Sequence, residues 1–231
     1  MKVRYASPIQ LMVSPGPKPN GLQASEDGLW VIDQGNAKVH LLDWESGKII
    51  KELQTATDRS SGITLDPEGN IWIASTYDCT IHKVDSNTGR TIQMYDSPGA
   101  GINATREAFS EVEKLTPTGD HGLEWKDDLL FIASPPSQYI HIMDPQKWKE
   151  VDRVKVPGFR VHGLAWAQEE GMIWAADTAM GVISKIRLSD ARVYDAFRVP
   201  ENVEVHGMTI KNNELWYCDD RRPIGTLNVD L

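Results

Sequence analysis

The sequence predicts an all-β protein folded as a five-bladed β-propeller, because one β-rich unit occurs five times along the chain. Each unit begins with a glycine followed by apolar residues, at intervals of 41, 60, 41 and 44 residues. These glycines are Gly21, Gly62, Gly122, Gly163 and Gly207. Intervals near 40 residues are typical of propeller blades. We therefore expect residues 1–231 to form a single domain, with an insertion at 97–120 inside the overlong interval.

Four short strands are predicted in each unit. The first strand follows the glycine, and a polar turn such as 26–28 separates it from a second strand centred on an aromatic residue. These aromatic residues are Trp30, Trp72, Phe131, Trp174 and Trp216. A third strand, such as 38–43, leads through a glycine-containing turn to the fourth. Aromatic and β-branched residues favour pleated strands, and Gly, Asn and Asp favour the turns between them.

The two ends of the chain are expected to meet. The fifth unit contains three predicted strands, and the strand-like stretch 3–13 precedes the first unit. We expect this stretch to pair with the last strand of the fifth unit, near 224–229. An open array of blades would expose unpaired strand edges, and joining the two ends removes them. The predicted ring is therefore closed by the N-terminal strand.

The insertion between the second and third units predicts one short helix. Asn103 or Thr105 can cap a helix over 105–115, and Pro117 limits its far end. Loops longer than about 12–15 residues in a compact domain are usually functional or disordered. Because the segment precedes an innermost strand, we expect it to lie over one mouth of the channel as a lid.

Charge and cysteine content exclude several classes of partner. The formal net charge is −9 at pH 7, and Lys and Arg residues are scattered along the chain. An acidic surface attracts neither nucleic acid nor an anionic membrane, so we expect neither partner. Cys79 and Cys218 are too few and too far apart for a disulfide framework or a cysteine-based zinc site. No stretch matches a membrane span or a signal peptide, so we expect a cytoplasmic protein with a small-molecule substrate and leave its oligomeric state open.

Three histidines occupy one position of the repeat, directly before the glycine: His121, His162 and His206. Asn20 and Ser61 fill the same position in the other two units. Residues before the innermost strands of a propeller lie at one mouth of its channel, so we expect the three imidazoles to converge there. Imidazoles from separate blades suit a divalent metal ion, which we expect to be Mg²⁺, Zn²⁺ or Mn²⁺.

Descent of the repeat is the alternative explanation for a recurring histidine, because duplication copies residues whether or not they act. It applies to His40, His82 and His141, which occupy equivalent third-strand positions and which we expect to be structural. For the mouth histidines both explanations stay open, and so does direct acid–base work without a metal.

Further candidates lie beside the predicted mouth. Glu204 precedes His206 by two residues and Asp120 adjoins His121, so either carboxylate can serve as ligand or base. Tyr77 is an additional catalytic candidate, because its position in the other units is small or polar. Arg221 is another, since an arginine can clamp a carboxylate or phosphate, and the alternative that 219–223 is a surface loop whose charges neutralise one another stays open. The expected substrate-binding residues are Asn20, Asp33, Ser134, Asp177, Asp219 and Arg160. For the three aspartates the alternative, capping of a turn at a strand end, is favoured.

The units "HGLAW" and "GMIWAADT" resemble the repeats of the virginiamycin B lyase, gluconolactonase (regucalcin) and NHL-repeat group of β-propellers. The resemblance covers nearly the whole chain. Virginiamycin B lyase opens a cyclic ester by elimination with a His, a Glu-x-His pair and a magnesium ion, and His162, Glu204 and His206 are similar to that set. Peptidylglycine amidating lyases hold zinc with three histidines from different blades, which His121, His162 and His206 resemble.

The resemblance implies a small-molecule lyase that eliminates or opens a C–O bond of the ester or lactone type, with a divalent ion at the mouth. Glu204 or His206 is the expected base, and His162 the expected ligand or acid. Two alternatives stay open. One is a metal-dependent hydrolase of lactones or esters at the same site. The other is a non-catalytic propeller that binds a ligand or partner on the histidine-bearing face.

Overall fold

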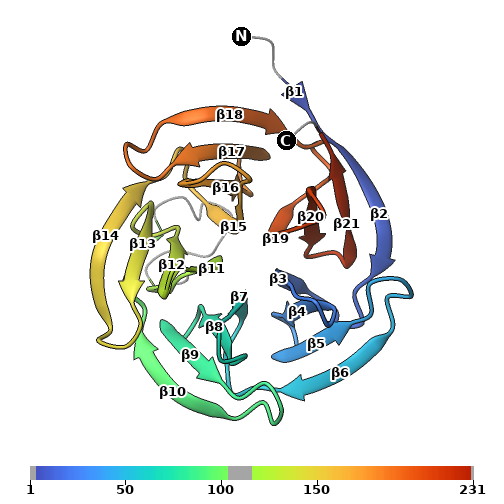
Figure 1. Ribbon diagram of the computed structural model, residues 1–231, viewed down its shortest axis with the longest axis vertical. Coiled ribbons are helices and arrows are strands. Elements are labelled where there is room, and N and C mark those ends of the chain that lie inside the picture. Colours follow the sequence, from blue (N-terminus) through green and yellow to red (C-terminus); the bar gives the residue numbers. More distant parts are fainter. Residues whose placement is uncertain (1–3, 104–115, 230–231) are drawn as a thin grey trace.

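Five β-sheets surround a central channel in the computed structural model, which describes residues 4–103 and 116–229 (Figure 1). Blade one contains β3 (Pro19–Ala24), β4 (Leu29–Asp33), β5 (Lys38–Leu42) and β6 (Ile49–Gln54). Blade two contains β7 (Ser60–Leu65), β8 (Ile71–Ser75), β9 (Thr80–Val84) and β10 (Thr91–Asp96). Blade three contains β11 (Leu123–Lys126), β12 (Leu129–Ser134), β13 (Tyr139–Asp144) and β14 (Lys149–Lys155). Blade four contains β15 (Val161–Trp166), β16 (Met172–Asp177), β17 (Val182–Arg187) and β18 (Val193–Arg198).

Both ends of the chain contribute to blade five. It contains β19 (Val205–Lys211), β20 (Glu214–Asp219) and β21 (Pro223–Asn228), with β2 (Ser7–Val13) as its outer strand. β2 runs antiparallel to β21, from Ser7 opposite Asn228 to Val13 opposite Pro223. The preceding strand β1 (Arg4–Tyr5) pairs in parallel with β18 of blade four. The N-terminal segment therefore joins blades four and five at the place where the two termini meet (Figure 1).

The expected helix in the insertion requires a correction. Residues 4–103 and 116–229 contain no helix, and hence none that could cross a membrane. The described flanks of the insertion form an isolated antiparallel bridge, in which the N–H groups of Gly101 and Thr118 each donate to the other's carbonyl oxygen, at 3.0 and 2.8 Å. Extended pairing therefore satisfies the backbone groups of these flanks and holds the two ends of the insertion together. The predicted helix itself, 105–115, lies outside the described residues.

The repeated glycines allow the inner strands of neighbouring blades to approach closely. A Cβ atom on Gly62 would lie 1.9 Å from the carbonyl oxygen of His121, and one on Gly122 would lie 2.0 Å from that of His162. No side chain fits at such distances. Among the inner strands the remaining cavity is only about 10 Å³, at the lower limit for a water molecule. The inner strands therefore block the channel, and its mouth opens into a pocket with a closed floor.

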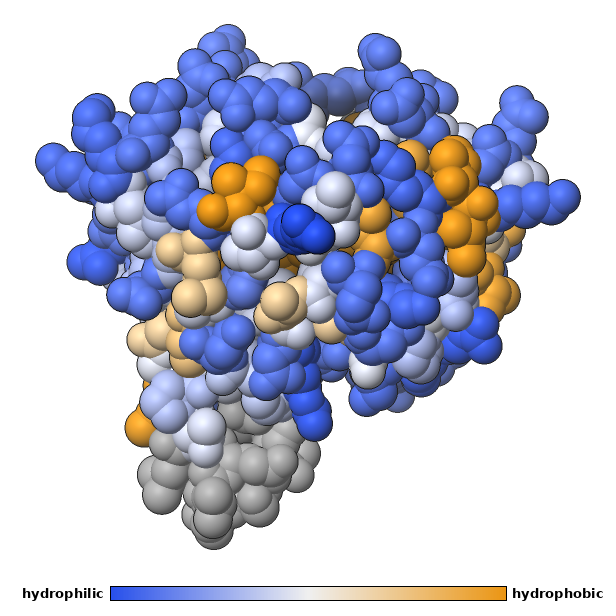
Figure 2. Space-filling view, turned by 90° about the horizontal axis from the view of Figure 1, so that it is seen from below, coloured by the Kyte–Doolittle hydropathy of each residue, from blue (hydrophilic) through white to orange (hydrophobic). Residues whose placement is uncertain are grey.

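Apolar side chains fill the spaces between blades, and the exterior is mostly polar. Trp72 and Trp174, at the centres of second strands, are 1% exposed. Exposed apolar residues such as Ile50 and Met94 lie on the outer strands. Figure 2 shows one side of the molecule as largely hydrophilic, with apolar residues in separate patches.

Candidate functional site

A pocket of about 180 Å³ lies at one mouth of the channel. All five blades contribute to it, because the segments before first strands and the turns after second strands reach the same face. Its lining residues are Lys18, Gln34, Arg59, Thr76, Tyr77, Asn103, Thr118, His121, Arg160, His206 and Asp220. The pocket has the size of a small molecule and holds five basic or imidazole side chains from the predicted mouth region and its flanks, which makes it the candidate site.

The structure brings the three predicted histidines together. The ring centroids of His121 and His162 are 4.0 Å apart, and those of His162 and His206 are 4.7 Å apart. All three side chains are buried: the exposed fractions are 8%, 2% and 3% for His121, His162 and His206. The close packing of the inner strands places the imidazoles in the floor of the pocket. His121 and His206 line it, and His162 lies between them.

His162 is held neutral by its surroundings. Neither ring nitrogen has a hydrogen-bond partner among the described residues. Burial lowers the pKa of His162 well below its usual value, and its neighbours His121, Arg160 and His206 would repel a charge on it and lower the pKa further. A buried imidazole with two unused nitrogens lowers stability, because each polar atom loses its hydration without gaining a hydrogen bond.

The tautomer of His206 follows from its backbone contact. Its Nδ1 lies 3.0 Å from the carbonyl oxygen of Glu204. A carbonyl only accepts hydrogen bonds, so Nδ1 carries the proton and, in the neutral ring, Nε2 keeps its lone pair. Burial lowers the pKa of His206, while the Glu204 carbonyl opposes that shift. His206 therefore offers a basic nitrogen that can accept a proton or bind a metal.

Glu204, His206 and Asp220 form a group that can hold a metal ion. One ligand atom from each lies within 4.8 Å of the others. The expected set was His121, His162 and His206, and this group shares only His206 with it. Carboxylate and imidazole ligands together suit divalent ions such as Mg²⁺, Mn²⁺ and Zn²⁺. The register of β19 and β20 pairs Val205 with Asp219, which places Glu204 and Asp220 at facing ends of one hairpin.

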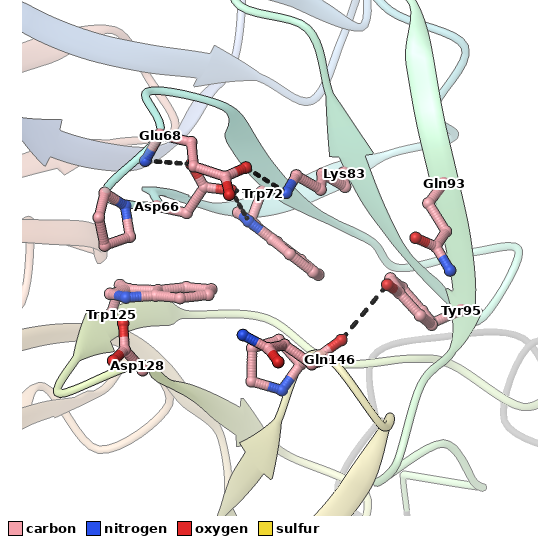
Figure 3. A pocket seen from close by; sticks show the side chains of 11 residues that line it. Asp66, Glu68, Trp72, Lys83, Gln93, Tyr95, Trp125, Asp128 and Gln146 are labelled. Carbon is pink, nitrogen blue, oxygen red and sulfur yellow. Dashed lines mark hydrogen bonds and ion pairs between the residues drawn. The ribbon is translucent and has the colours of Figure 1, made fainter.

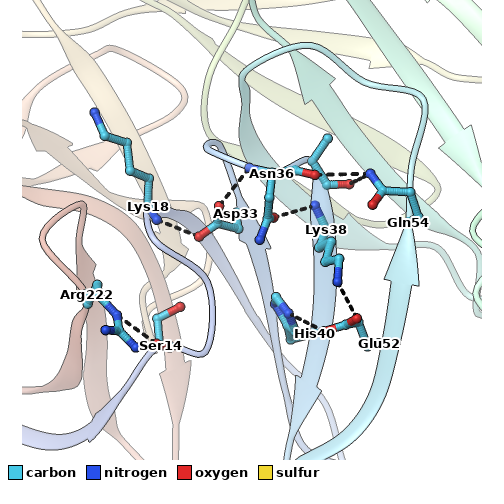
Figure 4. A network of polar contacts seen from close by, with 10 residues as sticks. Ser14, Lys18, Asp33, Asn36, Lys38, His40, Glu52, Gln54 and Arg222 are labelled. Carbon is cyan, nitrogen blue, oxygen red and sulfur yellow. Dashed lines mark hydrogen bonds and ion pairs between the residues drawn. The ribbon is translucent and has the colours of Figure 1, made fainter.

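The aspartates at the ends of second strands bind backbone groups. Asp33 accepts hydrogen bonds from the N–H of Lys18 at 2.6 Å and of Gly35 at 2.8 Å (Figure 4). Asp177 accepts from the N–H groups of Phe159 and Arg160 at 2.5 and 3.0 Å.

Asp219 completes this set in blade five. It accepts from the N–H of Glu204 at 2.9 Å and pairs with the Arg221 guanidinium at 2.6 Å. In all three blades the carboxylate fixes the segment that enters the inner strand, so the aspartates act as caps and position the residues that flank the mouth.

Other predicted residues divide between the pocket and its surroundings. Tyr77 and Arg160 line the pocket. Arg221 binds Asp219 and the Asn202 carbonyl oxygen, at 2.6 Å from each.

Three more predicted residues lie in the structure around the mouth. Asn20 is buried at the start of β3. The hydroxyl of Ser134 donates to the Gly99 carbonyl at 2.9 Å, which ties down the insertion. Asp120 is fully buried, and burial raises its pKa to about 6 against the opposing effect of Ser134.

Lys18 and Arg59 line the pocket and escaped the sequence prediction, whereas Gln34 and Asp220 follow second strands at the predicted mouth but were given no role. A signal for the two cations exists in the repeat. Lys18 and Arg59 stand two residues before Asn20 and Ser61, the same spacing that separates Arg160 from His162. Alignment of this one position across the units would have found them.

A second pocket, of about 290 Å³, lies between blades two and three on the opposite face (Figure 3). Lys83 occupies its polar side: its ammonium pairs with Asp66 at 3.0 Å and Glu68 at 3.1 Å and lies 5.6 Å from the centre of the Trp72 ring. Blade four repeats this arrangement, with Lys185 over Trp174 and paired with Glu169. The Lys83 ammonium is already paired within the protein, and the same pairing recurs in blade four, where it stabilises the fold. This pocket is therefore the weaker candidate for a functional site.

Solved structures of similar shape were found, although no protein-family model and no curated protein matches the sequence. Glutaminyl cyclase from Myxococcus xanthus matches with a TM-score of 0.73 and 11% identity, over 99% of each chain. Selenomethionine-substituted virginiamycin B lyase from Staphylococcus aureus matches with a TM-score of 0.58 and 14% identity, over 97% of this chain and 100% of that one. A streptogramin B lyase structure matches with a TM-score of 0.57 and 18% identity, over 98% of each chain.

This chain has the β-propeller fold of that group. The resemblance expected from the repeats is confirmed at the level of fold. At identities this low, a shared fold does not carry an activity with it.

Proposed function

We propose that this protein is a small-molecule lyase that eliminates or opens a C–O bond of the ester or lactone type at the channel mouth. The observation that carries the proposal is that the Glu204–His206–Asp220 group and the buried imidazoles lie together at one pocket with a closed floor. Such a pocket admits a small molecule, limits water and offers both a base and a cation site. Structural neighbours named as lyases support the choice of reaction class.

Glu204 and Asp220 would hold a divalent ion, with or without His206. A bound ion of this kind polarises a substrate carbonyl and so acidifies the adjoining C–H group. Mg²⁺ commonly takes only one or two protein carboxylates. Two carboxylates therefore suffice for it and leave the Nε2 lone pair of His206 for the substrate.

His206 is the proposed base. Its Nε2 accepts the proton from the carbon next to the carbonyl, the electron pair of that C–H bond forms a carbon–carbon double bond, and the C–O bond breaks. The leaving group of an ester is a carboxylate, which is stable at neutral pH and needs no acid. His162 touches no pocket surface, so its proposed role is to position the rings of His121 and His206 rather than to donate a proton.

Two other reactions suit parts of this site. Hydrolysis of the same bond would use a water molecule as nucleophile. Cyclisation of an N-terminal glutamine is favoured by one observation, the match to glutaminyl cyclase over 99% of both chains. Each reaction changes the mass of the substrate in its own way, and this allows a direct test.

The test is incubation of the protein with cyclic esters that carry an acidic C–H group, and separately with glutaminyl peptides, followed by mass spectrometry. Elimination opens a cyclic ester without change of mass and creates a double bond that absorbs ultraviolet light. Hydrolysis adds the mass of one water, and glutamine cyclisation removes that of one ammonia. Protein passed over chelating resin should lose activity and regain it with Mg²⁺ or Mn²⁺. A product that has gained water would refute the lyase.

A further inference from the structure

The mouth pocket adjoins a larger polar cavity above blades one and two. This outer cavity measures about 400 Å³ and shares Lys18, Gln34 and Arg59 with the mouth pocket. The two cations therefore stand where the cavities meet. A ligand that reaches the histidines from the outer cavity has to pass their side chains.

Cations recur at one position of the repeat, two residues before the mouth residue. Lys18, Arg59 and Arg160 occupy it in blades one, two and four, and all three line the mouth pocket. Gly119 and Glu204 occupy it in blades three and five. The whole chain carries a net charge of −9, so a pocket lined by three cationic side chains is not what its average composition would give.

Local structure holds these cations at the mouth. The Asp33 carboxylate binds the backbone N–H of Lys18, and Figure 4 shows the Lys18 side chain extending away from that contact. Among the described ion pairs neither Lys18 nor Arg59 takes part, whereas Arg221 is paired with Asp219.

Arg59 adopts φ of 49°, a left-handed conformation that non-glycine residues rarely adopt, and its guanidinium lies 4.7 Å from the centre of the Tyr77 ring. Backbone strain of this kind is concentrated at binding sites, where the surrounding structure has to compensate for it.

We propose that Lys18, Arg59 and Arg160 bind an anionic group, a carboxylate or a phosphate, on the small-molecule substrate. Guanidinium groups match both anions through paired hydrogen bonds, and the lysine adds a point charge. Glu204, His206 and Asp220 belong to blade five, so an anion held from blades one, two and four leaves the rest of the molecule facing the proposed base. The inference names the substrate class of the proposed lyase and rests on that function.

The experiment measures anion binding without turnover. Protein freed of metal on chelating resin is titrated calorimetrically with inorganic phosphate, with acetate and with neutral acetamide. Arg59→Asn is the main variant, because Asn is neutral and tolerates a left-handed φ; Lys18→Ala is the second. Arg90→Ala is the matched control, since Arg90 lies in the turn between β9 and β10 on the opposite face.

We expect phosphate, acetate or both to bind, at least tenfold more weakly to Arg59→Asn and Lys18→Ala, and unchanged to Arg90→Ala. The stronger of the two anions identifies the group. Absence of binding by the wild type, equal binding of acetamide, or equal weakening in Arg90→Ala would overturn the inference. Thermal melts confirm that each variant is folded. Anion binding with no turnover of any ester would refute the lyase and leave the anion site standing.

Discussion

His82 on a third strand and His162 at the mouth differ in how their ring nitrogens are paired. On the third strands, His82 bonds Thr80 and Thr91 at 2.9 and 3.1 Å, and His40 bonds Glu52 at 3.1 Å through Nε2, although its Nδ1 has no partner among the described residues. At the mouth, both nitrogens of His162 lack partners among the described residues. Satisfied polar atoms stabilise a fold, whereas buried unsatisfied ones are retained at a cost that function can explain.

Substitution of a histidine should therefore have different effects at the two positions. His206→Gln preserves size but removes the basic nitrogen, and should lower kcat/KM for ester elimination by about 10²–10⁴-fold with a modest change in melting temperature. His82→Gln, the matched control, disturbs two hydrogen bonds and should cost about 1 kcal/mol for each bond lost, with activity per folded molecule retained. If His206→Gln and His82→Gln changed kcat/KM and melting temperature equally, the recurring mouth histidine would be explained by duplication of the repeat rather than by function.

Asp120 should make stability depend on pH. Its pKa is about 6 in the folded protein and 3.8 as the reference value, so between these pH values the folded state binds more protons than the unfolded state. The free energy of unfolding should therefore fall by about 2 kcal/mol from this group as pH rises from 4 to 6. Asp120→Asn should lose that contribution, as denaturant melts at both pH values would show. A constant difference between variant and wild type across this range would contradict the prediction.

The β19–β20 hairpin is the element on which the candidate metal group is built. Pairing of Val205 with Asp219 sets the register, and the Asp219 carboxylate holds the N–H of Glu204 at 2.9 Å. Glu204 directly precedes β19, His206 lies near its start, and Asp220 follows the end of β20. All three ligands therefore come from one hairpin and need no long-range assembly. The hairpin itself therefore brings Glu204, His206 and Asp220 together.

Metal binding should depend on this hairpin. Mn²⁺ at roughly 100 times its dissociation constant should stabilise the protein by about 2.7 kcal/mol, and this gain should disappear in Glu204→Gln and Asp220→Asn. Glu214→Gln, at the exposed far end of the same hairpin, is the control and should keep it. Thermal melts with and without Mn²⁺ provide the measurement. Loss of the gain in His121 or His162 variants alone would instead support the three-histidine site.

At the scale of the whole molecule, five inner strands meet so closely that the mouth residues of one blade touch the glycine of the one before it. The carbonyl oxygens of His121 and His162 occupy the space that a Cβ on Gly62 or Gly122 would need. The same closeness plugs the channel and buries the imidazoles. The close packing of five inner strands thus contributes to the stability of the ring and sets the depth of the mouth pocket.

Gly62→Ala should consequently destabilise the ring. The added Cβ would meet backbone, which cannot rotate away, so we expect a loss of at least about 1–3 kcal/mol. Gly101→Ala is the control, because its Cβ would lie at an ordinary 3.6 Å from Pro136. Chemical denaturation of the two variants gives the comparison. A Gly62→Ala protein as stable as Gly101→Ala would show that the strands can separate at little cost.

The sequence by itself determined the architecture and one position of the site. Repeat period, strand patterning and the recurring Gly–apolar step are local properties, so five blades and the convergence of His121, His162 and His206 follow from them. Only the tertiary structure decided which polar groups face the pocket. Hairpin register joined Asp220 to Glu204, and ring closure placed Lys18 and Arg59 beside Arg160. The relative positions of Lys18, Arg59 and Arg160 depend on distances between segments far apart in the chain, and these distances are set by how tightly the five inner strands pack.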